Sequence, residues 1–176
     1  MMLNFLLVIV LLPIYVFVIR RPLFFAQERV GKGGDLFRAY KFCTMQDNDS
    51  DIDLTGGAKP KAFVNMLYLT LRRSHLDEIP QVLNVYKADM SLIGPRPYTV
   101  DETERLSKVI NEFGLRSSIK PGITGLAQIN YDHRNIDESA QVKFDLDISY
   151  ITNASLLLDI RIATNTVFEI CRYRGI

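Results

Sequence analysis

The sequence contains no tryptophan and only two cysteines, Cys43 and Cys171, which lie far apart and outside any C-x-x-C pattern. This spacing argues against a disulfide framework and against a zinc site, and a reducing compartment fits it better. An excess of charge is also lacking, because 21 basic and 20 acidic residues give a formal net charge of +1. We therefore expect no nucleic-acid partner, since an extended nucleic-acid surface needs a clear excess of positive charge. A chain of 176 residues has room for one core.

A long apolar run opens the chain. From residue 1 to 19 only Asn4 and Pro13 interrupt it, and Arg20 and Arg21 end it. A run of roughly 20 apolar residues is long enough to span a bilayer. A cleaved signal peptide does not fit, because no basic residue precedes the run and no small-residue cleavage site follows it. Taken alone, these residues favour a single span kinked at Pro13 over a re-entrant hairpin, with the two arginines at the cytoplasmic surface.

Two runs of apolar and aromatic residues, 23–30 and 36–42, flank Gly31-Lys32-Gly33-Gly34. Because glycine allows a tight connection, this pattern predicts a β-hairpin. A phosphate-binding glycine loop is the alternative, but the Lys-Ser/Thr ending of a P-loop is missing. The acidic segment 47–53 indicates a solvated loop, because the glycine and the terminal glutamate of a calcium loop are absent.

Several later segments have helical patterns. We expect helices over residues 62–71, 80–86, 101–113, 137–150 and 154–173. The first is strongly apolar with basic residues at both ends, so a core helix and a membrane-surface helix both stay open. The last carries an apolar stripe at helical spacing, which we assign to the core: Leu156, Ile160, Ala163, Val167 and Ile170.

Glycine marks two of the connections. Gly114 follows the expected helix over 101–113 and is interpreted as its end. Gly122 and Gly125 lie in Lys120-Pro121-Gly122-Ile123-Thr124-Gly125, where they allow another backbone segment to approach closely.

The segment Ser74-His75-Leu76-Asp77-Glu78-Ile79-Pro80-Gln81 places two adjacent carboxylates ahead of a proline. One interpretation is a helix cap in which Ser74 and Asp77 bind each other's backbone, although Pro80 would then lie inside the helix. If the helix instead begins at Pro80, both acids stand just before its N-terminus, where the dipole favours anions and phosphate. An ionised aspartate is a competent nucleophile toward phosphorus and can share Mg²⁺ with a diphosphate.

Arginines accompany the two acids. Arg72 and Arg73 precede them, and Gly94-Pro95-Arg96-Pro97 follows. The two prolines fix the backbone on either side of Arg96, which is useful for bidentate phosphate binding. A rigid surface turn with a solvated arginine is the alternative. Carboxylates beside arginines are the components of a phosphoryl-transfer site.

Together these segments resemble a known family, the monotopic bacterial phosphoglycosyl transferases, also called bacterial sugar transferases. The matching motifs, in order, are residues 23–31 (LFFAQERVG), 40–45 (YKFCTM), 76–85 (LDEIPQVLNV), 89–97 (DMSLIGPRP) and 120–130 (KPGITGLAQIN). The resemblance implies an α+β, mainly helical fold. It also implies a re-entrant membrane helix over residues 1–21, broken at Pro13, which reverses the preference for a plain span. A compact cytoplasmic catalytic domain with a short hairpin and membrane-surface amphipathic helices is then expected over residues 22–176.

The resemblance further implies transfer of a sugar 1-phosphate from a UDP-sugar to polyprenyl (undecaprenyl) phosphate, with release of UMP. The expected setting is the cytoplasmic leaflet of the bacterial inner membrane, at the first membrane step of surface polysaccharide or glycoconjugate assembly. By carry-over Asp77 is the nucleophile, forming an aspartyl-phosphosugar intermediate, and a Mg²⁺ ligand, while Glu78 supports it. The positions that match substrate-binding residues are Lys41, Arg72, Arg96 and Arg134. A homodimer is also expected.

Two alternatives come from other classes of protein. A non-catalytic, membrane-anchored scaffold of the same fold is favoured by the segment from Asn130 to Arg134, which departs from the family pattern. The intact Asp77, Glu78 and Arg96 argue against a scaffold. A secreted domain behind an uncleaved anchor would need an exported C-terminus, which cytoplasmic accessibility of Cys171 would exclude.

Overall fold

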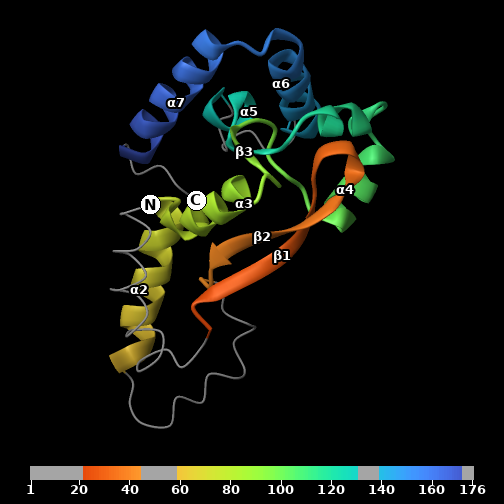
Figure 1. Ribbon diagram of the computed structural model, residues 1–176. Coiled ribbons are helices and arrows are strands. Elements are labelled where there is room, and N and C mark those ends of the chain that lie inside the picture. Colours follow the sequence, from red (N-terminus) through yellow and green to blue (C-terminus); the bar gives the residue numbers. More distant parts are fainter. Residues whose placement is uncertain (1–21, 45–58, 131–138, 172–176) are drawn as a thin grey trace. The chain divides into compact units, whose positions relative to one another are not determined.

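The computed structural model describes residues 22–44, 59–130 and 139–171. This part of the chain is mainly helical and contains two small two-stranded sheets (Figure 1). The predicted α+β, mainly helical fold is confirmed for it. No helix within it is long and apolar enough to cross a membrane. The predicted membrane helix over 1–21 and the acidic loop over 47–53 lie outside the described residues.

The described residues divide into two compact units. The first contains residues 22–25, 41–44 and 59–80, and the second contains 26–40, 81–130 and 139–171. Each unit has its own hydrophobic core.

A β-hairpin contributes residues to both units. Strand β1, Phe24–Val30, is followed by the single-turn 3-10 helix η2, Lys32–Gly34, and by strand β2, Leu36–Phe42. Gly33 and Gly34 have φ angles of 69° and 90°. These angles are readily adopted only by glycine, so the glycine-rich connection closes a hairpin, as the sequence predicts.

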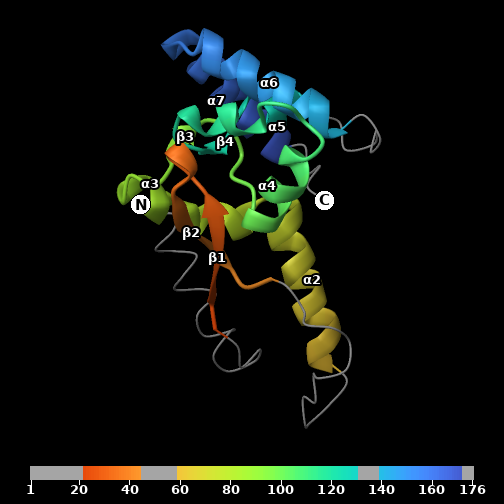
Figure 2. The same ribbon diagram turned by 90° about the vertical axis from the view of Figure 1, so that its right-hand side faces the viewer.

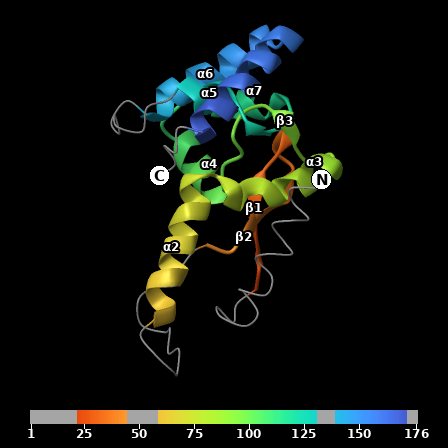
Figure 3. The same ribbon diagram turned by 90° about the vertical axis from the view of Figure 1, so that its left-hand side faces the viewer.

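The first unit is built on helix α2, Lys59–Arg73, and the 3-10 helix η3, Leu76–Gln81. Figure 3 shows α2 as a continuous helix. Its core joins the hairpin to the end of α2 through Leu23, Phe42, Tyr68 and Leu71. Met66 and Leu69 of the same helix are 60% and 48% exposed, so only one side of α2 packs into the core.

The second unit contains most of the remaining elements. In chain order they are α3 (Val82–Tyr86), β3 (Ser91–Ile93), α4 (Val100–Ser107), η4 (Phe113–Ser118), β4 (Gly122–Thr124), α5 (Leu126–Asn130), α6 (Ser139–Asn153) and α7 (Leu156–Cys171). Strands β3 and β4 pair in parallel, α7 contacts both strands, and α5 contacts α6 and α7 (Figure 2). Ile110, Phe113 and Phe144 form the core beneath α6.

Helix α4 is shorter than the predicted helix over 101–113. A capping box begins it, in which Thr99 accepts from the backbone N–H of Glu102 and the Glu102 side chain accepts from that of Thr99. The helix ends at Ser107, and Glu112 then adopts a left-handed φ of 60°. A left-handed residue cannot continue a right-handed α-helix, so the predicted end at Gly114 is wrong.

The apolar stripe of α7 does not lie in the core. Leu156 is 77% exposed, Ile160 54% and Val167 60%, whereas Ile162 is fully buried. The helix packs through the face that carries Ile162 and Thr166, one turn apart, and Thr166 shares a hydrogen bond with β4. The assignment of Leu156, Ile160, Ala163 and Val167 to the core is therefore wrong, because contact with β3 and β4 selects the neighbouring face. The side chain of Ile170 lies outside the described residues.

Candidate active site

The two adjacent acids lie inside a helical segment and not ahead of one. Asp77 and Glu78 occupy the first turn of η3, Pro80 lies within it, and α3 begins only at Val82. The predicted helix start at Pro80 is therefore wrong. The segment tolerates a proline, which removes one helical hydrogen bond, because it is anchored to the first unit's core.

The residues before the pair end α2 and do not cap η3. The Ser74 hydroxyl donates to the carbonyl oxygens of Thr70 and Leu71, at 2.7 and 3.2 Å. The capping interpretation of Ser74 is therefore wrong. His75 has a left-handed φ of 54° and donates its N–H to the carbonyl of Arg72, which ends α2 and redirects the chain into η3.

The period of η3 separates the two acids. A 3-10 helix has about three residues per turn, so residues three apart share a face. Leu76 and Ile79 are such a pair, and both pack against the first unit's core. Asp77 and Glu78 consequently point in the two other directions, which gives them different surroundings.

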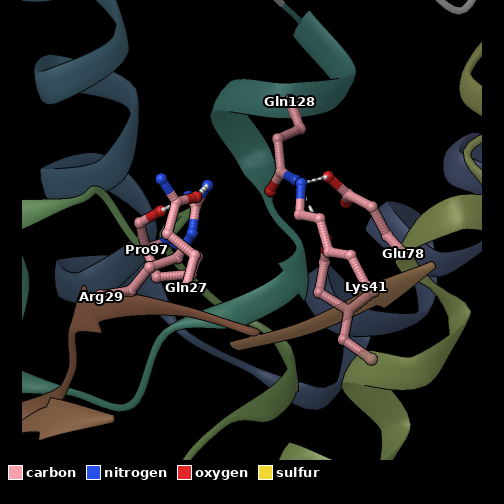
Figure 4. Close-up of polar contacts among 7 residues, drawn as sticks. Gln27, Arg29, Lys41, Glu78, Pro97 and Gln128 are labelled. Carbon is pink, nitrogen blue, oxygen red and sulfur yellow. Dashed lines mark hydrogen bonds and ion pairs between the residues drawn. The ribbon is translucent and has the colours of Figure 1, made fainter. Parts of the chain in front are cut away.

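Glu78 is buried and forms an ion pair with Lys41. Its side chain accepts a hydrogen bond from Lys41 Nζ, with 2.7 Å between Nζ and Oε1 (Figure 4). Only 8% of Glu78 is exposed, and the Lys41 side chain is 18% exposed. Lys41 precedes Phe42, which lies in the core, so the strand fixes the lysine beside the acid.

Asp77 is half-buried and its pKa is raised above the ordinary value. Burial is the main cause and the charge of Glu78 the second, while Lys41, His75 and the backbone N–H of Asp77 itself oppose the rise. The ionised form is thus held at elevated free energy. That free energy is released when a cation approaches the carboxylate or when the carboxylate forms a covalent bond and loses its charge.

The predicted substrate-binding residues are distributed between the units. Lys41 and Arg72 belong to the first unit with the acids; Lys41 binds Glu78, and Arg72 is exposed in the last turn of α2. Arg96 belongs to the second unit, where it is half-buried between Pro95 and Pro97, both of which are buried. It is therefore not simply a solvated surface arginine. Arg134 lies outside the described residues.

The backbone before Arg96 packs directly on the glycine-rich turn. A Cβ atom added to Gly122 would lie 2.1 Å from the nitrogen of Gly94, and one added to Gly125 would lie 2.1 Å from its oxygen. Real Cβ atoms do not approach that closely, so the close backbone approach predicted for Gly122 and Gly125 is confirmed.

Sequence reasoning missed four charged residues around Arg96. They are Arg29, Arg116, Lys143 and Asp147. Lys143, on α6, is half-buried, and its pKa is lowered by burial first and by the charge of Arg96 second. Arg116 and Asp147 are 31 positions apart, and no short motif connects them. Only Arg29 lies in a segment that the sequence singled out.

A family model described as bacterial sugar transferase matches residues 1–173. The chain belongs to the bacterial sugar transferase family. It is 37% identical over 150 residues to the UDP-glucose:undecaprenyl-phosphate glucose-1-phosphate transferase of Escherichia coli K12, covering 84% of this chain and 32% of that protein. A UDP-N-acetylgalactosamine-undecaprenyl-phosphate N-acetylgalactosaminephosphotransferase of Aeromonas hydrophila is 36% identical over 146 residues, covering 83% and 34%.

A shorter relative is matched over most of its length. The protein named uncharacterized sugar transferase EpsL of Bacillus subtilis is 40% identical over 156 residues, which cover 88% of this chain and 73% of EpsL. By contrast, the chain spans about a third of the length of the Escherichia coli relative.

Proposed function

We propose that the protein transfers a sugar 1-phosphate from a UDP-sugar to undecaprenyl or another polyprenyl phosphate. The family match supports this reaction, as do the printed names of relatives that act on UDP-glucose or UDP-N-acetylgalactosamine and undecaprenyl phosphate. Two further relatives, named exopolysaccharide production protein ExoY and galactosyl transferase CpsE, support a role at the first membrane step of surface polysaccharide or glycoconjugate assembly.

The chemistry proceeds in two displacements at phosphorus. A carboxylate oxygen of Asp77 attacks the sugar-linked phosphorus, and the bond from that phosphorus to the bridging oxygen breaks with release of UMP. An oxygen of polyprenyl phosphate then attacks the same phosphorus, the bond to Asp77 breaks, and the carboxylate is regenerated. The single observation that carries this assignment is the contrast within η3: Glu78 is buried and ion-paired, whereas Asp77 is half-buried with a raised pKa.

Glu78 and Lys41 have supporting roles in this proposal. Their ion pair fixes the side of η3 that carries Glu78, and the negative charge of Glu78 raises the pKa of Asp77. A more basic carboxylate is a stronger nucleophile than a free aspartate. Arg72 and Arg96 would bind phosphate oxygens, and Arg134 keeps the same proposed role.

The donor set near Asp77 fits Mg²⁺ that arrives with the substrate. No cluster of three acidic, histidine or cysteine side chains occurs within the described residues, so these residues form no complete protein cage. Mg²⁺ is commonly held by one or two carboxylates together with substrate phosphates, which matches the half-buried Asp77 beside Glu78. Asp77 would be the ligand, and the ion would neutralise the oxygens of the diphosphate.

Association with the cytoplasmic leaflet of the inner membrane is part of the proposal. Its support is the row of exposed apolar side chains on α7, which includes Leu156, Leu157, Ile160, Val167 and Phe168. Co-flotation with vesicles of anionic phospholipid tests it. The wild-type protein is expected to float, and the double variant Leu157→Glu with Phe168→Glu is expected to reduce the floating fraction. Unchanged flotation of the double variant would show that α7 does not contact the membrane. The homodimer stays a prediction.

Release of UMP tests the reaction. Detergent-solubilised wild-type protein and Asp77→Asn are incubated with Mg²⁺, polyprenyl phosphate and each member of a panel of UDP-sugars. Release by the wild type that disappears in the variant supports the transferase, and the responding sugar identifies the donor. Folded wild-type protein that releases UMP from no sugar, while a related transferase is active in parallel, favours the non-catalytic scaffold.

A further inference from the structure

The backbone around Arg96 is held at four consecutive carbonyl groups. Gly122 N donates to the carbonyl oxygen of Pro95 over 2.9 Å, and Val30 N donates to that of Tyr98 over 3.0 Å. The two carbonyls between them accept from guanidinium groups: Arg96 from Arg116 and Pro97 from Arg29 (Figure 4 shows the latter). Because Pro95 and Pro97 have no N–H, this segment cannot form regular secondary structure. Side chains therefore donate the remaining hydrogen bonds to its carbonyl groups.

Arg116 is itself rigidly held. It is 7% exposed, and its guanidinium contacts Asp147, which is 2% exposed, through Nε at 3.1 Å and through Nη2. The guanidinium carbon lies 4.2 Å from the centre of the Tyr98 ring and 5.1 Å from that of Phe113. Nη2 also donates to the carbonyl oxygen of Arg96 over 2.9 Å. The planar guanidinium thus connects α6 directly to the residue predicted to bind phosphate.

Stability alone does not account for this pair. A buried ion pair carries a large desolvation penalty, and well-packed apolar residues often replace one without loss of stability. The penalty is visible here, because burial raises the pKa of Asp147 even though the charge of Arg116 opposes the rise. What apolar side chains cannot supply is the directed N–H that fixes the carbonyl of Arg96.

We propose that Arg116, oriented by Asp147, is a positioning residue that holds Arg96 for binding the phosphate oxygens of the nucleotide-sugar donor. The inference rests on the proposed function and assigns a role to two residues that do not themselves touch substrate. Fixing the backbone of Arg96 before the donor arrives lowers the backbone entropy that this segment must lose on binding. Arg29 supports the same segment at the next carbonyl.

Two variants separate positioning from folding. Arg116→Lys keeps a cation for Asp147, but a single ammonium does not reproduce the planar fork that reaches both the carboxylate and the carbonyl. Arg116→Met with Asp147→Leu removes both charges and keeps apolar packing, so it still tests the inference if Arg116→Lys proves unstable. Arg105→Lys, at an exposed arginine of α4, is the matched control. Thermal unfolding of each variant establishes that it is folded.

Donor binding is read in two ways. In steady-state assays with the UDP-sugar that the wild type uses, both Arg116 variants are expected to raise the donor KM by about 10-fold or more, with a smaller change in kcat. Titration calorimetry with UDP and Mg²⁺ is expected to show a matching rise in Kd without turnover. Arg105→Lys is expected to leave both constants unchanged.

A double-mutant cycle identifies the route of the effect. In an Arg96→Ala background, Arg116→Lys is expected to add no further rise in the Kd for UDP, because Arg116 acts through Arg96. A folded Arg116 variant with KM and Kd within twofold of the wild type would overturn the inference, as would an equal effect in both backgrounds. Either result is compatible with the proposed transferase function, whereas absence of turnover by the wild type would reject that function itself.

Discussion

Lys41 binds Glu78, the second acid of the adjacent pair, with 2.7 Å between Nζ and Oε1. The pairing gives neighbouring carboxylates opposite conditions: Glu78 is buried and neutralised, whereas Asp77 is half-buried and has a raised pKa. Neighbouring acids with different environments are suited to different roles. The proposed nucleophile is therefore the acid whose ionised form is destabilised by burial and by the charge of its neighbour.

Removing Lys41 is expected to destabilise the fold. Lys41→Met removes the ammonium group that donates to the buried Glu78, and we expect a loss of about 2 kcal/mol, below the roughly 3–5 kcal/mol of a fully buried pair. The smaller value reflects side-chain exposures of 18% and 10%, which allow some solvation. Urea unfolding measures the loss.

The double variant Lys41→Met with Glu78→Leu is expected to recover most of that stability, because it removes both charges of the pair. Lys108→Met, at an exposed lysine, is the control and should change stability by less than about 0.5 kcal/mol. Equal losses in the single and double variants would show that Lys41 contributes through packing and not through Glu78.

Replacing the proposed nucleophile is expected to stabilise the protein at neutral pH. The pKa of Asp77 is higher in the folded state than its ordinary value of 3.8, so its stability contribution is present below that value and is lost as pH rises through the folded pKa. Asp77→Asn removes the unfavourable charge. We expect a gain of about 0.5–2 kcal/mol at pH 7, as at other functional sites.

Thermal unfolding across pH, in the presence of EDTA, measures that gain. It is expected to shrink as pH falls through the folded pKa and to disappear well below pH 3.8, where Asp77 is protonated in both states. A lower Tm for Asp77→Asn at pH 7, or a gain that does not vary with pH, would contradict the raised pKa.

The close contact between Gly94, which follows β3, and Gly125, which follows β4, predicts different effects for two alanine substitutions. In Gly125→Ala the new Cβ would lie 2.1 Å from the oxygen of Gly94, so the backbone segments after β3 and β4 must separate. We expect a loss of about 2–3 kcal/mol in the free energy of unfolding. Gly114→Ala meets no atom within 4 Å and is expected to be neutral or stabilising by up to about 1 kcal/mol. Similar effects of both substitutions in urea unfolding would refute the close approach.

The charge of Arg96 lowers the pKa of Lys143, after the larger effect of burial. Arg96→Gln is therefore expected to raise the pKa of Lys143, because the ammonium no longer faces a second positive charge. An NMR titration that follows the side-chain signals of Lys143 measures the change, with Arg105→Gln as a control that should leave it unaltered. A pKa that stays constant or falls in Arg96→Gln would place the two cations too far apart to interact.

Local signals in the sequence were sufficient for the hairpin and for the glycine contacts. Gly33 and Gly34 have positive φ, and Gly122 and Gly125 meet the backbone of Gly94, so each depends on the residue present at that position. The Thr-x-x-Glu pattern of Thr99 and Glu102 is a further local signal, because it forms the capping box that begins α4.

Tertiary packing decided the features that were mispredicted. The sequence places Asp77 and Glu78 ahead of a helix, but Leu76 and Ile79 anchor a 3-10 helix that contains both acids. The apolar stripe of α7 has perfect helical spacing, yet the face with Ile162 contacts the strands. Arg116 and Asp147 could not be paired from sequence, because a contact across 31 positions leaves no periodic signal.

The central claim is that Asp77 carries the sugar phosphate during the reaction, and trapping that intermediate tests it most directly. The protein is incubated with Mg²⁺ and the UDP-sugar it uses, without polyprenyl phosphate, and then analysed by intact-protein and peptide mass spectrometry. We predict a mass increase of one sugar phosphate on the peptide containing Asp77, lost on addition of polyprenyl phosphate and absent in Asp77→Asn. UMP release that requires the acceptor and leaves no adduct, or an adduct on another residue, would contradict the account.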